Sequence, residues 1–233
     1  MSIHKGHRAR VRERFLREGL DGFEEHEVLE MLLFYCVARK DTNEMAHLLL
    51  KEFGSLPMVL SATPTELQRV PGVNQGVCTF FSFINELERY RNIKTTQDEG
   101  NVLRSVEACG KYLSPFFRSR RNEEVYLLCL DAKCKVIGCK RIGEGSVNSA
   151  GVPIRRIVEV ALNLNATAVV LAHNHPSGLA LPSGEDIHTT RLVAQALQAV
   201  DVVLADHIIV ADDEFVSLKQ SNYFLNEDVF CEL

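Results

Sequence analysis

The sequence lacks long apolar runs and contains little proline or glycine. Its 233 residues include 7 prolines and 14 glycines, too few for a collagen-like or low-complexity chain. No stretch approaches the roughly 18–20 consecutive apolar residues that a membrane-spanning helix needs. We therefore expect a globular protein that does not cross or bind a membrane.

The first residues lack the apolar core of a secretory signal. Residues 1–15 read MSIHKGHRARVRERF and are polar and basic, whereas a signal peptide carries a continuous apolar segment. The expected location is the cytoplasm.

Cysteine pairs with metal-binding or redox spacing are also absent. No two of the seven cysteines are separated by two residues, the spacing found in zinc ribbons and thioredoxin-like sites. Cys129, Cys134 and Cys139 are evenly spaced, but we interpret them as reduced thiols on and beside a strand.

Positive charge is scarce overall and concentrated near the start. The net charge of −5 argues against a protein that coats nucleic acid over its whole surface. Residues 1–20 nevertheless contain two glutamates against six basic residues: Lys5, Arg8, Arg10, Arg12, Arg14 and Arg17. This basic arm fits an element that contacts phosphates and equally a solvated helix with ion pairs between its turns.

The hydrophobic pattern predicts two domains. Residues 8–91 repeat apolar side chains at helical spacing, which indicates a bundle of short helices. Residues 92–101 are polar and lack this period, so we place a linker there. The prediction is a helical domain over residues 1–91 and a second domain over residues 102–233.

Helices and strands alternate in the second domain, which is typical of an α/β fold. The expected elements are a helix over 102–117, a β-hairpin over 124–142, a helix over Ile154–Asn163, a strand over Ala166–Ala172, a helix over Glu185–Val200, a strand over Val202–Val210 and a final strand near Glu214–Leu218.

His173 and His175 follow the apolar strand 166–172 directly. The turn Pro176-Ser177-Gly178 interrupts strand alternation, so both imidazoles can face one cation. The loop after these histidines can fold back, so that Asp186, at the start of a helix, supplies a third ligand to the same cation. Three nitrogen and oxygen ligands leave one position open for water, as in catalytic zinc sites. The sequence therefore predicts one Zn²⁺ per chain.

Hydrolysis of an amide also needs a base and a group that stabilises the oxyanion. Ser183, three residues before Asp186, is suited to donate a hydrogen bond to the oxyanion. Spacing alone does not choose the base among four carboxylates: Glu123, Glu124, Glu144 and Glu159.

The pattern His173-x-His175-Pro176, followed by Ser183-x-x-Asp186, resembles the JAMM (MPN+) metalloprotease motif. The run HNHPSG and the segment DHIIV at 206–210 resemble the RadC branch of that family, and the resemblance covers nearly the whole chain. It implies an α/β (α+β) domain with a mixed sheet and flanking helices. It also implies a zinc-dependent peptidase or isopeptidase, whose substrate the sequence does not identify.

The same resemblance suggests two further roles. The segment Glu124-Val125-x-x-Leu128-x-Leu130-Asp131 is similar to the strand that carries the JAMM glutamate. It implies Glu124 as the base, with Glu123, one position earlier, as the alternative. His207, within DHIIV, either orients a metal ligand or is a hydrogen-bonded histidine of the core.

The segment Leu67–Val77 resembles the helix-hairpin-helix turn found in the first domain of RadC proteins. Gly72 suits its tight turn, and Asn74 stands where a second glycine is expected. Such a turn can hold a DNA phosphate at the following helix, although many serve only in packing or protein contact. The candidate DNA contacts are Arg69, Gly72, Asn74 and Gln75, with Arg8, Arg10 and Arg12 of the basic arm.

Two other functions remain open at this point. One is a metal-dependent nuclease, although the sequence lacks the ββα unit of HNH nucleases. The other is an accessory protein of DNA repair or recombination whose metal is not catalytic. The sequence leaves the oligomeric state open, a homo-oligomer included.

Overall fold

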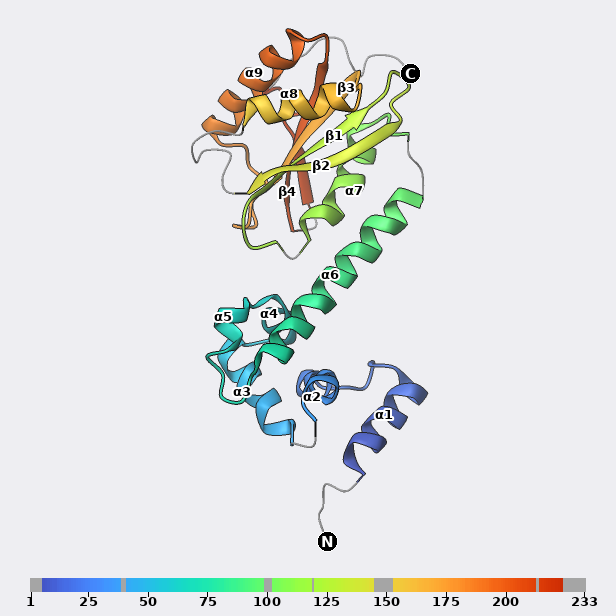
Figure 1. Ribbon diagram of the computed structural model, residues 1–233, viewed down its shortest axis with the longest axis vertical. Helices are drawn as coiled ribbons and strands as arrows, with labels where there is room; N and C mark the ends of the chain where they lie inside the picture. Colours follow the sequence, from blue (N-terminus) through green and yellow to red (C-terminus); the bar gives the residue numbers. More distant parts are fainter. Residues whose placement is uncertain are drawn as a thin grey trace. The chain divides into compact units, whose positions relative to one another are not determined.

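The computed structural model describes residues 6–38, 41–98, 102–118, 120–144, 153–212 and 214–223. Contacts divide the chain into two units, residues 1–88 and residues 89–233. In the described residues, helices build the first unit, and helices with one sheet build the second (Figure 1). The expectations for residues 99–101, within the predicted linker, and for 224–233 lie outside the described residues.

The first unit is the predicted bundle of short helices. Its core contains the fully buried side chains of Leu29, Leu33, Leu49 and Phe81. Local signals set the helix starts: Thr63, for example, forms a capping box with Glu66. The helices are α1 (His7–Glu18), α2 (Glu25–Cys36), α3 (Asn43–Phe53), α4 (Leu56–Ser61), α5 (Pro64–Leu67) and the first part of α6 (Gln75–Asp98).

Helix α6 continues through much of the predicted linker. It extends to Asp98, whereas a polar connection was expected from residue 92. Ile93 packs against the hydrophobic core of the second unit, and Thr96 donates a side-chain hydrogen bond to the carbonyl of Asn92. The prediction of a linker was wrong for residues 92–98. Ile93 is the one apolar residue among them, and a single apolar residue shows no helical periodicity.

The second unit has the predicted mixed sheet with flanking helices. The strand order is β2-β1-β3-β4-β5; only β3 and β4 pair in parallel, and the other neighbours are antiparallel. The elements are α7 (Val106–Phe117), β1 (Glu124–Leu130), β2 (Val136–Glu144), α8 (Ile154–Asn163), β3 (Ala168–Asn174), α9 (Gly184–Gln198), β4 (Val203–Ala211) and β5 (Glu214–Ser217).

Helices cover both faces of this sheet (Figure 1). One face packs against α8 and α9, and the other packs against α7. Because successive strand residues point to opposite faces, β3 sends Val169 and Leu171 toward α8 and α9, and Val170 and Ala172 toward α7. Burial on both faces explains why β3 reads as a continuous apolar run.

The described cysteines are free thiols. Cys129 belongs to the core beside α8 and α9, whereas Cys139 packs against the core beside α7, so these two do not form a metal site. Burial raises the pKa of Cys129 to about 12.

Among the described helices, none combines the length and apolar character that a membrane crossing requires.

Gly110 of α7 lies directly beneath the ring of Phe215, so a Cβ at this position would overlap the ring atoms. We expect Gly110→Ala to lower the free energy of unfolding by about 1–3 kcal/mol, because overpacking outweighs the gain in helix propensity. Thermal or urea denaturation measures this. Gly143→Ala is the matched control, since nothing lies within 4 Å of its Cβ position; equal effects would contradict the packing argument.

Candidate metal centre

The two histidines lie at the end of strand β3. His173 is the penultimate residue of the strand and is fully buried. His175 follows the strand, and its backbone N–H donates to the carbonyl of Val210 in β4. Its imidazole retains 16% exposure. The centre is therefore closed on the side of the core and open to solvent at His175.

Asp186 comes from the first turn of helix α9. Ser183 caps this helix: its hydroxyl accepts from the N–H of Asp186, and its own N–H and hydroxyl both donate to Asp186 Oδ2. This capping box fixes the carboxylate rotamer and leaves Oδ1 directed at His173. The carboxylate is 3% exposed.

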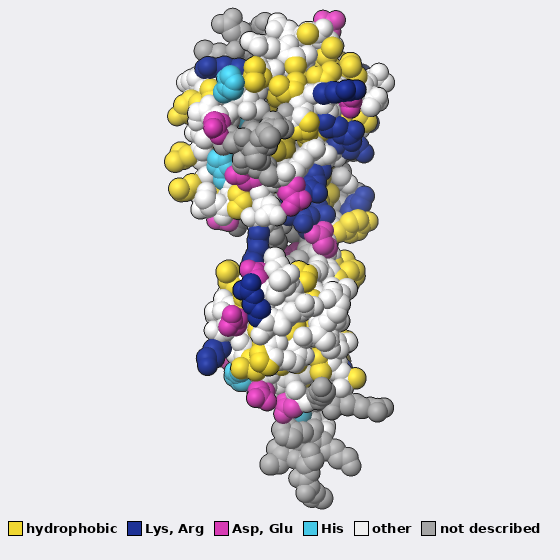
Figure 2. Space-filling model, turned by 60° about the vertical axis from the view of Figure 1, so that its left-hand side comes forward, with side chains coloured by type: hydrophobic (Ala, Val, Ile, Leu, Met, Phe, Trp, Pro, Cys, Tyr) yellow, Lys and Arg dark blue, Asp and Glu magenta, His cyan; other side chains and the backbone are white. Residues whose placement is uncertain are grey.

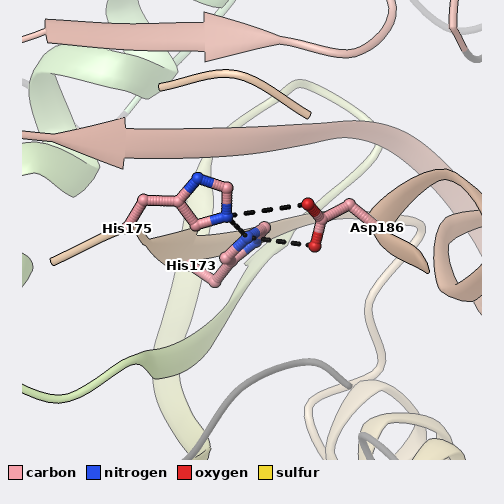
Figure 3. Close-up of side chains that lie close together, drawn as sticks. All are labelled: His173, His175 and Asp186. Atoms are coloured by element: carbon pink, nitrogen blue, oxygen red, sulfur yellow. Dashed lines mark hydrogen bonds and ion pairs between the residues drawn. The ribbon is translucent and has the colours of Figure 1, made fainter. Parts of the chain in front are cut away.

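The three side chains converge on one point, as Figure 3 shows. His173 Nε2 lies 2.9 Å from His175 Nε2 and 3.2 Å from Asp186 Oδ1. His175 Nε2 lies 3.6 Å from Asp186 Oδ2. All three ligand atoms lie within 4.8 Å of one another, so one cation can contact them together.

Hydrogen-bond directions identify the proton on each imidazole. His175 Nδ1 lies 3.0 Å from the carbonyl oxygen of Leu179, which can only accept, so this nitrogen carries the proton. Thr190 donates its hydroxyl proton to the carbonyl of Asp186 at 2.5 Å, so it accepts from His207 Nδ1 at 2.6 Å. His207 Nε2 is then an acceptor, and His173 Nδ1 donates to it at 2.8 Å.

These directions leave both Nε2 atoms as unprotonated acceptors that face each other and a carboxylate. Three acceptors with no proton between them repel one another unless a cation lies among them. Imidazole nitrogens and a carboxylate oxygen are the donor set typical of Zn²⁺. The residues therefore fit a divalent metal.

The electrostatics are consistent with a cation site. Burial raises the pKa of Asp186, but hydrogen bonds from Ser183 and the interaction with His173 lower it by more, so its pKa lies below the usual value; the contribution of His173 applies when its Nε2 carries a proton, in the place that a bound cation would otherwise take. Burial, followed by the proximity of His173, holds the pKa of His207 well below its usual value. The carboxylate is thus charged and His207 is neutral.

Glu124 lies on the other face of the sheet. In the β1–β3 register Val125 pairs with His173, so Glu124, one residue earlier, points away from the metal ligands. Its carboxylate is 3.1 Å from the Arg141 guanidinium and accepts a hydrogen bond from Tyr126 at 3.2 Å. This geometry contradicts the assignment of the base to Glu124, because one position along a strand reverses the face.

Glu123 is the residue before β1, and continuing the alternation of the strand by this one residue assigns its side chain to the sheet face of Val125 and His173. Asn174, between the two histidines, clamps the backbone on both sides of Glu123. Its Oδ1 accepts from the N–H of Glu124 at 2.8 Å, and its Nδ2 donates to the carbonyl of Asn122 at 3.1 Å. The side chain of Glu123 is half-buried. The clamp holds this residue beside the end of β3.

The other candidate carboxylates have different partners. Glu144, at the end of β2, accepts from Asn122 and Arg141, and Glu159 pairs with Arg155 on the surface of α8. Two residues of the centre carried no signal in the sequence. Thr190 reads as an ordinary helix residue, and Asn174 reads only as the middle letter of His-Asn-His.

The predicted hairpin connects α5 to α6 in the first unit. Gly72 has a φ of 87°, which a tight turn there requires. Asn74 accepts a hydrogen bond from the N–H of Val77 at 3.1 Å and so caps α6, which explains its presence in place of glycine. Arg69, Gly72, Asn74 and Gln75 are all exposed, but Gln75 already pairs with Gln68.

The basic arm packs largely on its own domain. Arg8 donates to the carbonyl of Val37 at 2.9 Å and lies 4.9 Å from the ring centroid of Phe34. Arg12 lies over the same ring and over Tyr35. These contacts favour the interpretation as a structural helix for Arg8 and, through its stacking, for Arg12, although Arg12 is exposed like Arg10.

Comparison with known proteins agrees with this architecture. Residues 103–223 match the family model of the RadC-like JAB domain. UPF0758 protein PBPRA0202 of Photobacterium profundum is 37% identical over 92% of this chain and 96% of its own length. UPF0758 protein FN0909 of Fusobacterium nucleatum is 34% identical over 93% of this chain and 96% of its own length. The chain therefore belongs to the RadC family and carries a RadC-like JAB domain.

Proposed function

We propose that the protein is a zinc-dependent hydrolase that cleaves a peptide or isopeptide amide. The observation that carries the proposal is the convergence of His173, His175 and Asp186, whose ligand atoms all lie within 4.8 Å of one another. JAB-like domains have a metalloprotease-type fold. A bound divalent cation would supply Lewis-acid polarisation of a carbonyl and would lower the pKa of water.

Glu123 is the base in this proposal. The clamp by Asn174 and the alternation of β1 favour Glu123 over Glu124. Its carboxylate would take a proton from the attacking water and pass it to the leaving nitrogen. Ser183 donates its only hydroxyl proton to Asp186 Oδ2, so in this proposal it would release that hydrogen bond and donate to the oxyanion when substrate is bound. These are the two roles that hydrolysis requires of the chain itself.

His207 and Thr190 are positioning residues in the same proposal. The chain of hydrogen bonds from Thr190 through His207 to His173 Nδ1 keeps the proton on Nδ1 and the lone pair on Nε2. Such partners of a metal-binding histidine raise its basicity and hold its ring in place. This favours the first of the two interpretations of His207.

Thr190→Val tests the hydrogen-bond chain at its end. The substitution keeps the shape but removes the hydroxyl, so His207 Nδ1 loses its acceptor and no longer fixes the tautomer of His173. We expect metal affinity to fall by about 10–100-fold, measured by competition with a chelating indicator. Thr190→Ser retains the hydroxyl and should bind metal like the wild type. Equal losses in both variants would contradict the role assigned to the hydroxyl.

The proposed activity is tested by metal analysis and an unbiased search for cleaved proteins. Purified protein should contain roughly one zinc per chain. The zinc-loaded protein, mixed with a proteome, should generate new peptide or lysine amines that mass spectrometry identifies and that chelator treatment prevents. Metal retention without any new amine would favour a non-catalytic metal. Cleavage of plasmid DNA that Asp186→Ala abolishes would favour a nuclease instead.

A further inference from the structure

A cavity of about 770 Å³ lies in the second unit, and none of the three candidate metal ligands lines it. Three segments line it: the second half of α6, helix α7 and the turn from β4 to β5. All of these residues follow residue 88 and belong to one unit. Its volume falls in the range of roughly 300–1,000 Å³ that is typical of small-ligand sites.

Positive side chains from two helices line this cavity. Arg91 of α6, Lys111 of α7 and Arg118, the residue after α7, contribute them, and all three are exposed. The surrounding sequence is basic, unlike the chain as a whole. Residues 89–121 contain eight lysines and arginines against three acidic residues, whereas the net charge of the whole chain is −5. On the face that Figure 2 draws, lysine and arginine side chains of the second unit lie among acidic and hydrophobic ones. The cavity therefore favours an anion.

The remaining lining narrows the chemistry of that anion. Phe215 offers an aromatic ring, and its half-buried position is fixed because it packs on Gly110. Asp212 adds a carboxylate, which would repel an all-anionic ligand but accept from a hydroxyl or amino group. Asn92 and Thr95 add further polar groups. A suitable ligand combines negative charge, hydrogen-bond donors and an apolar ring.

We propose that this cavity binds a nucleotide, either free or within a single strand of nucleic acid. Phosphate would pair with Arg91, Lys111 and Arg118, and the base would stack on Phe215. The sugar hydroxyls or the base amino group would donate to Asp212. The carboxylates of an acidic peptide would also pair with the three basic side chains, but they would repel the carboxylate of Asp212 and offer it no hydrogen-bond donor.

The cavity borders the loop of the metal centre. A carboxylate oxygen of Asp212 lies 3.2 Å from the position that a Cβ at Gly178 would occupy, and Gly178 donates its N–H to the carbonyl of His175. A nucleotide in the cavity would therefore lie next to this loop, on the face of the sheet that packs against α7. Its binding does not depend on the proposed hydrolysis.

The test is fluorescence anisotropy of the full-length protein with a short fluorescein-labelled oligothymidylate. The wild type should bind it, and the double substitution Arg91→Gln/Lys111→Gln should weaken binding by about tenfold or more, because charge-assisted hydrogen bonds are lost. Lys133→Gln/Lys135→Gln is the matched control. It removes the same charge from exposed positions of the same unit outside the cavity and should bind like the wild type.

Two results would overturn the proposal. No binding by the wild type is one, and equal weakening by both double variants, which indicates general electrostatic attraction, is the other. Phe215→Leu adds a specific readout: it should weaken the oligonucleotide by several-fold while leaving competition by inorganic phosphate unchanged. If this variant bound the oligonucleotide as tightly as the wild type, the base would not stack on Phe215, and the proposal would be contradicted.

Competition identifies the source of the nucleotide. If adenosine monophosphate displaces the labelled oligonucleotide at concentrations similar to those of the unlabelled oligonucleotide, the ligand is a free nucleotide. If only the unlabelled oligonucleotide displaces it, the ligand is nucleic acid. Either result supports the site. Binding should persist in the variant His173→Ala/His175→Ala. A loss in that variant would tie the nucleotide to the metal and contradict the proposal, whereas a failed search for hydrolysis would leave it standing.

Discussion

The double substitution His173→Ala/His175→Ala is expected to abolish stoichiometric zinc binding. It removes two of three ligand atoms that converge within 4.8 Å, and one remaining carboxylate does not hold zinc at neutral pH against water. Metal content should fall from roughly one equivalent per chain to a trace, measured by inductively coupled plasma mass spectrometry after dialysis. The stabilisation that zinc gives the wild type in thermal denaturation should disappear with it.

His188→Ala is the matched control for this loss. His188 lies two residues after Asp186 in α9 and is exposed, so it tests whether any histidine near the centre contributes. The control should retain the metal of the wild type. Retention of a full equivalent by the double variant, with the fold intact by circular dichroism, would exclude the centre as the zinc site.

The second large effect is expected at Glu123. Glu123→Gln keeps the size of the side chain but removes its capacity to accept a proton, so kcat should fall by about 100- to 10,000-fold. Zinc content should remain that of the wild type, because Glu123 is not among the three converging ligands. The rate is measured on whichever substrate the proteome search identifies, under single-turnover conditions with saturating enzyme.

Glu124→Gln separates the two neighbouring carboxylates. It weakens the ion pair between the buried Glu124 carboxylate and the exposed Arg141, and the hydrogen bond from Tyr126, so it should lower the melting temperature. Its kcat should stay within about threefold of the wild type, since its side chain faces away from the metal ligands. A large loss of kcat in Glu124→Gln with none in Glu123→Gln would reverse the assignment.

Local sequence determined most of the elements of this fold. The apolar run of β3 and the periodicity of α8 and α9 depend on neighbouring residues, so the sequence alone places them. The candidate metal ligands were also predictable from local sequence, because His173 and His175 are adjacent to a turn and Ser183 caps the helix that carries Asp186. A short motif sufficed there, since each ligand is positioned by residues close to it in the chain.

Only the tertiary structure decided which glutamate shares a sheet face with His173 and what orients the candidate ligands. Glu123 and Glu124 are indistinguishable until strand register fixes their faces, and register depends on pairing between segments about fifty positions apart. His207 and Thr190 meet His173 through contacts between β4, α9 and β3. The extent of α6 likewise depends on Ile93 meeting a core distant in sequence. Contacts of this kind leave no periodic pattern, because they arise where separate elements come together.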